Sequence, residues 1–262
     1  MKNLYAALWV EILKVRKSKV FWISVIFFCF IPMALALMIF VQKYPEIAAK
    51  LGMIGEKAEL MKLGEPVWSN FFNLINMFLS AVGLIGFGFI TSWIFGQEYS
   101  DKTLKDVLAL PVSRGYIVTA KLITALIWSV ILSAVFFILS LLMGKIVGIS
   151  DWSAEIFRES LTIFIIIMLL TIMLCTPIAF LSSWSRGILF PIGFIILTMI
   201  LSNFTGLVGL SPYFPWSIPG LFSMPVSSGG NGHLTTSLII LFSTSAAGYL
   251  ATILWWKYAD HK

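Results

Sequence analysis

The sequence predicts an all-α integral membrane protein with six transmembrane helices. Of its 262 residues, 59% are hydrophobic and 11% are charged, whereas a soluble domain is typically about 45–50% apolar and about 25% charged. The mean hydropathy is +0.97. The 18 basic and 12 acidic residues all lie outside six long apolar segments. A soluble fold of this length has no use for so much apolar surface, and we therefore expect lipid to cover it.

Each of the six segments is long enough to cross a membrane. A helix that spans a hydrocarbon core of about 30 Å needs about 20 apolar residues. The expected spans are Val20–Val41, Phe71–Phe95, Leu122–Met143, Leu161–Leu181, Ile188–Leu210 and Thr236–Trp256. Three of them contain a proline that could bend the helix, at Pro32, Pro177 and Pro191. We expect residues 1–262 to form a single transmembrane domain.

The distribution of Lys and Arg predicts the orientation. If the N-terminus is cytoplasmic, the cytoplasmic segments hold twelve basic residues and the outer segments hold six. The basic cluster between Lys14 and Lys19, directly before the first span, carries most weight. The positive-inside rule therefore predicts that both termini are cytoplasmic. The net charge of +6 is explained by topology, and we expect no nucleic acid as a partner.

Residues 2–19 predict an amphipathic helix that lies in the membrane surface. Leu4, Leu8, Ile12 and Val15 recur at helical spacing. The expected polar face holds Lys2, Asn3, Glu11, Lys14 and Ser18. Such a helix would place its cations near anionic headgroups. The alternative is a frayed basic tail that only sets topology.

Two outer segments are unusual. Residues 42–69 are mixed in charge and could hold a short helix at Pro45–Lys62. Ser211–His233 has no Lys, Arg, Asp or Glu but has four prolines with aromatic residues between them. This composition favours re-entrant backbone, which is stable at membrane depth only when protein buries it or it lines a cavity. An ordinary loop in the aromatic belt is the alternative.

The sequence offers little for catalysis. It has no phosphate-binding loop and no nucleophile elbow, and its cysteines and histidines do not have the spacing of metal ligands. We therefore expect no catalytic residue, no metal and no directly bound cofactor. The absence of ionisable residues from the six apolar ranges also disfavours proton-coupled transport.

The connection between the second and third spans is the most informative segment. It reads Gln-Glu-Tyr-Ser-Asp-Lys-Thr-Leu-Lys from residue 97 and ends in Pro-Val-Ser-Arg at 111–114. Thr103–Leu110 can form two helical turns, Pro111 breaks the helix, and Ser113 can cap the next one. A plain hairpin loop with no docking role could be shorter and less apolar.

This segment resembles the first cytoplasmic loop of permeases of type-2 ABC exporters, including small six-span permeases for peptide-antibiotic export or lantibiotic and bacitracin self-protection. In that family Glu is followed five residues later by Thr-Leu, and then by Pro-x-Ser-Arg. The resemblance implies that the loop docks on a separate ATPase subunit, which would bind the ATP. The implied coupling residues are Glu98, Thr103, Leu104, Leu108, Pro111 and Arg114. It also implies a contact between residues 4–19 and the ATPase, and a second permease subunit, identical or different.

The second span carries a polar stripe. Asn73, Asn76, Ser80 and Gly83 are spaced by 3, 4 and 3 residues and therefore share a helix face. Amides in a bilayer need partners, so the stripe could line a translocation path or serve as helix-packing contacts. Asn203 and Thr205 form a second, weaker polar spot.

These observations together predict the permease subunit of an ATP-driven exporter in the cell membrane. The expected cargo is amphipathic or peptide-like, with self-protection against an antimicrobial peptide as one role. Two alternatives stay open: a non-transporting assembly or sensor component, and a secondary transporter. The first needs no docking loop, and the second would depend on an ion gradient.

Overall fold

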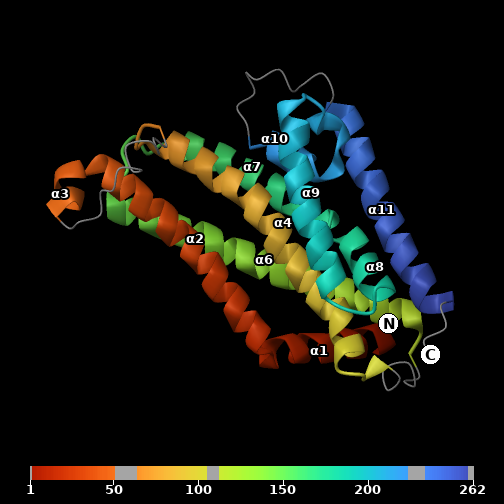
Figure 1. Cartoon of the computed structure of the whole chain (residues 1–262). Helices are drawn as coiled ribbons and strands as arrows, with labels where there is room; N and C mark the ends of the chain where they lie inside the picture. The colour runs from red at the N-terminus through yellow and green to blue at the C-terminus, as the bar shows by residue number, and fades with distance from the viewer. Residues whose placement is uncertain (1, 51–63, 105–111, 224–233, 259–262) are drawn as a thin grey trace.

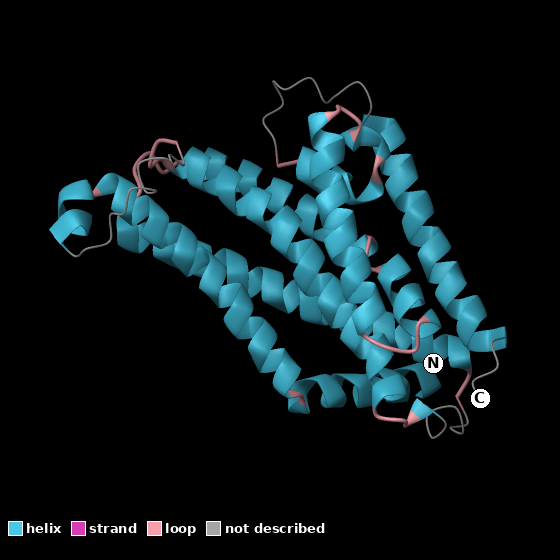
Figure 2. Cartoon of the chain, in the orientation of Figure 1, coloured by secondary structure: helices cyan, strands magenta, loops and turns pink. Residues whose placement is uncertain are grey.

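The computed structural model describes residues 2–50, 64–104, 112–223 and 234–258 (Figure 1). These residues form helices joined by short connections, without a β-strand (Figure 2). An isolated bridge pairs Val67 with Ser150. The all-α prediction is confirmed.

The described residues contain six helical segments that are long and apolar enough to cross a membrane, as predicted. They are α2 (Lys19–Lys43), α4 (Trp68–Ser100), α6 (Arg114–Val147), the pair α7 (Ala154–Met173) and α8 (Thr176–Trp184), α9 (Leu189–Leu207) and α11 (Leu234–Tyr258). Helix α4 is the most buried of the six and packs against α6, α7, α8 and α9. It forms the centre of the molecule.

The fourth span is broken where the sequence has Pro177. Helix α7 ends at Met173, and α8 begins at Thr176. A proline ring collides with the carbonyl four residues before it, which here belongs to Met173. The Thr176 hydroxyl, which has one proton to donate, lies 3.0 Å from this carbonyl and 2.7 Å from that of Ser245 in α11, so the carbonyl that the break leaves free has a donor beside it. Pro32, in contrast, lies inside a continuous α2.

A separate helix, α1 (Lys2–Lys17), precedes the first span. Ser18 ends it and caps α2, because its hydroxyl accepts a hydrogen bond from the Val20 amide at 3.0 Å. Helix α1 runs across one end of the bundle and packs on α6 (Figure 1). Tyr5 and Trp9 are exposed, as an interfacial helix requires. The expected polar face is wrong in one respect: Glu11 is buried against the bundle.

Both termini lie at the same end of the bundle (Figure 1). The C-terminal end of α4 lies there too, and the turn at 185–188 lies beside it, since an added Cβ at Gly96 would lie 3.0 Å from the Gly187 backbone. The short helix α3 (Pro45–Lys50) lies at the opposite end (Figure 1). The remainder of the predicted helix Pro45–Lys62 falls outside the described residues.

The described part of the proline-rich segment is partly buried against the helices. It forms η1 (Ser211–Tyr213), η2 (Pro215–Ser217) and α10 (Ile218–Leu221). Ile218 is 0% exposed and belongs to a cluster with Leu174 and Leu241. The Ser237 hydroxyl of α11 donates to the Pro212 carbonyl at 2.8 Å. This burial is what re-entrant backbone needs, and it favours that interpretation over a simple surface loop; residues 224–233 lie outside the description.

Candidate functional site

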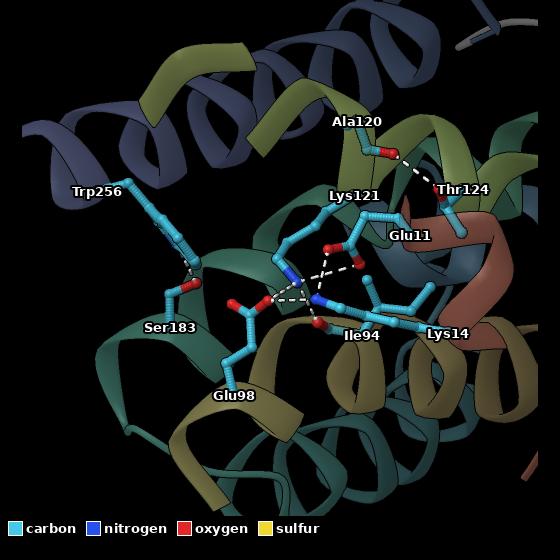
Figure 3. A network of polar contacts seen from close by, with 9 residues as sticks. All are labelled: Glu11, Lys14, Ile94, Glu98, Ala120, Lys121, Thr124, Ser183 and Trp256. Atoms are coloured by element: carbon cyan, nitrogen blue, oxygen red, sulfur yellow. Dashed lines mark hydrogen bonds and ion pairs between the residues drawn. The ribbon is translucent and has the colours of Figure 1, made fainter. Parts of the chain in front are cut away.

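Four charged side chains from three helices meet in one site (Figure 3), at the end of the bundle where α1 lies (Figure 1). Helix α1 contributes Glu11 and Lys14, α4 contributes Glu98, and α6 contributes Lys121. The Lys121 ammonium lies 2.9 Å from Glu98 Oε1 and 3.3 Å from Glu11 Oε2. The Lys14 ammonium lies 3.0 Å from Glu98 Oε1 and 3.0 Å from Glu11 Oε1. We call this set the four-charge cluster.

Lys121 is the centre of the cluster. It is 1% exposed, although it lies seven residues inside α6. An ammonium has three donors, and here the third donates to the Ile94 carbonyl of α4 at 3.0 Å. Every donor of this buried cation therefore has an acceptor.

The cluster is balanced in charge. Two carboxylates oppose two ammonium groups, so the site as a whole is neutral. Neutrality matters because removing one partner from a buried ion pair costs about 3–5 kcal/mol. Burial lowers the pKa of Lys14, but its ion pairs with Glu11 and Glu98 outweigh burial and raise that pKa above 10.5. Lys14 therefore stays charged at neutral pH.

Regular helix geometry brings the groups together. Glu11 and Lys14 are three residues apart and thus neighbours on α1, and Ile94 and Glu98 are four apart on α4. Glu98 was expected to be one of two anchors of the docking loop, with Arg114 as the other, but Glu11, Lys14 and Lys121 were not predicted as its partners. One signal was available, since Glu11 is the sole acidic residue before Glu46.

Arg114, the other predicted anchor, joins α6 to the last helix. It is the first residue of α6, and its guanidinium donates to the carbonyls of Trp256 at 3.0 Å and Lys257 at 3.3 Å. These carbonyls lie at the C-terminal, partly negative end of α11, where a cation is favoured. The Trp256 indole in turn donates to the Ser183 hydroxyl of α8 at 2.9 Å (Figure 3).

The loop begins with a helix-ending motif. The Thr103 amide bonds to the Glu98 carbonyl at 3.0 Å, and the Lys102 amide bonds to the Tyr99 carbonyl at 3.3 Å. This is the Schellman pattern, with Lys102 in the left-handed region at φ 59°. Thr103 is exposed, as a contact residue would be, but Leu104 is 9% exposed and packs into the core. Leu108 and Pro111 lie outside the described residues.

The residues of the polar stripe of α4 lie in different environments. Asn73 is exposed, while Asn76 and Gly83 are buried. The Ser80 hydroxyl donates to the Met77 carbonyl of its own helix at 2.8 Å, and an added Cβ at Gly220 of α10 would lie 3.8 Å from it. Helix α10 thus covers the middle of the stripe, which favours helix packing there. The four residues of the stripe do not form a continuous polar path.

No group of three or more His, Cys, Asp or Glu residues that could hold a metal occurs in the described parts of the chain. The four-charge cluster has only two carboxylates, and both are paired with lysines. The arrangement connects three helices through ion pairs.

Comparison with known proteins identifies the family. Residues 7–204 match the family model described as ABC-2 family transporter protein. The chain is also 30% identical, over 182 residues, to the bacitracin transport permease BCRB of Bacillus licheniformis, a match that covers 68% of this chain and 86% of the relative. No solved structure matches. The match to the family model includes α1, α4 and α6, which carry the four-charge cluster, and the chain belongs to the ABC-2 transporter family, as the membrane permease subunit of an ABC exporter.

Proposed function

We propose that this permease exports a peptide antibiotic, using ATP that a separate ABC ATPase hydrolyses, and that the ATPase acts on it through α1 and residues 98–114. The peptide cargo is supported by the similarity to a bacitracin transport permease. The coupling route is supported by the four-charge cluster, which is the observation that carries the proposal.

The cluster sits where the predicted docking loop leaves the bundle. Glu98 is two residues before the end of α4, and its carbonyl accepts the bond that turns the chain into the loop. The carboxylate of the same residue contacts α1 and α6. A force on the loop or on α1 therefore reaches three helices together, because their ends are joined by buried ion pairs.

Arg114 extends the connection to the other side of the loop. It links the beginning of α6 to the end of α11. The two ends of the loop are thus attached to helices that are distant in sequence, and a displacement of the loop would tilt the spans relative to one another. Such tilting is how alternating access would release cargo.

The assembly we propose has two permease subunits and two ATPase subunits in the cell membrane, with the termini and the docking loop in the cytoplasm. The positive-inside distribution of Lys and Arg supports this orientation. The location of both termini, the C-terminal end of α4, the start of α6 and α1 at one end of the bundle is consistent with it. The outer loops would then lie at the end that holds α3 and α10.

The test is co-purification from native cells in mild detergent, scored for an ABC ATPase and followed by bacitracin susceptibility of the same cells. Thr103→Trp adds bulk to an exposed loop residue whose side chain is not part of the core. We expect it to reduce ATPase recovery and peptide protection while the permease stays folded. Glu98→Lys should reduce both and also lower stability.

Glu159→Lys is the matched control, because Glu159 is exposed on α7, outside the docking loop, and makes no ion pair within the described residues. It should behave as wild type. If wild type brings down no ATPase even after cross-linking in intact cells, the coupling proposal fails. If an ATPase is recovered but loss of the permease leaves susceptibility to bacitracin and related peptides unchanged, the peptide cargo is wrong.

A further inference from the structure

A pocket of about 560 Å³ lies at the end of the bundle opposite the termini. Its apolar lining comes from α6, the start of α4 and the connection that follows α6. The lining residues are Trp68, Ile138, Leu141, Leu142, Ile149 and Trp152, with Lys145 as the charged member. A volume in this range is typical of sites that bind small organic ligands.

The walls of the pocket are held by close packing. An added Cβ at Gly144 would lie 2.6 Å from the Trp68 ring, so α6 and α4 approach as closely as a glycine permits. The Trp68 amide donates to the Ser150 carbonyl at 3.1 Å, and its ring meets Trp152 edge-on at 4.8 Å between centroids. The bond from the Ile149 amide to the Gly144 carbonyl, at 3.1 Å, ends α6 and directs the chain along the pocket. The pocket is therefore preformed.

Positive charge borders this apolar space. Lys145 is exposed and forms no ion pair with the carboxylates that the structure describes. Lys43 of α2 donates to the carbonyls of Val147 and Gly148 at the same end of α6. Two cations thus flank the last turn of α6, beside a cavity lined by hydrocarbon and indole.

We infer that this pocket binds an anionic lipid of the surrounding membrane, with an acyl chain against the apolar wall and the headgroup at Lys145. The spans end at this level, where tryptophans such as the exposed Trp152 are favoured between hydrocarbon and headgroups. A basic side chain near the surface attracts an anionic headgroup. A cationic peptide is disfavoured, since it would meet Lys43 and Lys145. The inference does not depend on the proposed cargo or ATPase.

Three substitutions separate the two parts of the site. Leu142→Trp fills the apolar volume. Lys145→Gln removes the charge, and Lys145→Arg keeps it. Ile146→Trp is the control for added bulk, because Ile146 is a neighbouring α6 residue that is 74% exposed and does not line the pocket.

The experiment places the full-length chain in nanodiscs that hold equal amounts of phosphatidylglycerol and phosphatidylcholine with identical acyl chains. Lipids that stay bound after release from the disc are identified by native mass spectrometry. Wild type should retain phosphatidylglycerol about fivefold more than phosphatidylcholine, the preference expected for one basic residue near a headgroup. Lys145→Gln should abolish the preference, and Lys145→Arg should keep it.

Leu142→Trp should lower retention of both lipids, while Ile146→Trp should match wild type. Equal retention by Leu142→Trp and Ile146→Trp would overturn the assignment of the chain to this pocket. Equal retention of the two lipids by wild type would overturn the role of Lys145. A wild type that retains no lipid would overturn the inference.

Discussion

The four-charge cluster predicts a strong energetic coupling between Glu98 and Lys121. We consider Glu98→Gln, Lys121→Met and the double variant. Lys121→Met leaves Glu11 and Glu98 with Lys14 as their single cation, and Glu98→Gln leaves two lysines with Glu11 as their single carboxylate. Each single change creates one uncompensated charge in a buried site.

The magnitude follows from burial. The side chains of Lys121 and Glu98 are 1% and 4% exposed, and Lys121 Nζ lies 2.9 Å from Glu98 Oε1. Removing one partner of such a pair should lower the free energy of unfolding by about 3–5 kcal/mol. The double variant removes one charge of each sign and restores neutrality, so its loss should be smaller than the sum of the single losses by about 2–3 kcal/mol. Lys14→Met should lower the free energy of unfolding by roughly 1 kcal/mol, because the Lys14 side chain is 34% exposed and water can replace part of its contacts.

The assay is reversible unfolding in mixed micelles, titrated with a denaturing detergent and analysed as a double-mutant cycle. Lys145→Met serves as the unconnected partner, since Lys145 lies at the other end of α6. When Lys145→Met is combined with Lys121→Met, the loss in free energy of unfolding should equal the sum of the two single losses. If the Glu98 and Lys121 losses also add within about 0.5 kcal/mol, the two residues do not form the ion pair described, and the coupling argument built on it is refuted.

Two backbone positions give further predictions, measured by the same unfolding assay. Lys102→Gly should raise the free energy of unfolding by about 0.5–1 kcal/mol, because φ is 59° at Lys102 and glycine adopts this region without strain; a lower value would show that the Lys102 side chain makes a compensating contact. Gly248→Ala should lower it by about 1–3 kcal/mol, because the new Cβ would lie 2.4 Å from the backbone nitrogen of Pro177, which cannot move without displacing α8. Gly193→Ala is the control, since nothing lies within 4 Å of its added Cβ; equal losses in the two variants would contradict the close packing of α11 on α8.

The spans could be predicted because lipid imposes a simple rule, namely that charges stay out of hydrocarbon. The same rule does not fix where helices end. Helix α4 extends from Trp68 to Ser100, beyond the expected span Phe71–Phe95, and α6 extends beyond the expected span Leu122–Met143, with its start at Arg114 directly after the predicted cap position Ser113. Backbone hydrogen bonds continue past the hydrocarbon as readily as within it, so hydropathy marks the membrane and not the helix.

The sequence predicted a bend in the fourth span but did not distinguish it from the bend expected at Pro32. Pro177 indicated a possible bend, but Pro32 gave the same signal and lies in a continuous helix. The difference lies in tertiary contacts. At the break, the carbonyl of Met173 is satisfied by Thr176, whose hydroxyl also reaches α11. A single sequence does not show which proline has such a neighbour.

The cluster itself was missed because the sequence analysis assumed that a charged residue on an amphipathic helix faces water. That assumption fails when charges of opposite sign can be brought together. Glu11 turns inward because Lys121 of α6 offers it a partner 110 positions away in the chain. Lys121 can be buried, in turn, because its three donors all have acceptors, including the Ile94 carbonyl.

A neutral cluster of ion pairs that joins three helices also explains why the coupling end of a membrane protein would use charges where an apolar core could be equally stable. Apolar contacts allow helices to slide, since neighbouring packings differ little in free energy. Ion pairs fix which atoms meet, because any shift leaves a buried charge without a partner. At the junction of α1, α4 and α6 this selectivity would make the three helices move as one unit beside the docking loop. A sensor or assembly component has no evident need for that rigidity at a loop, whereas a permease driven from its cytoplasmic loop does.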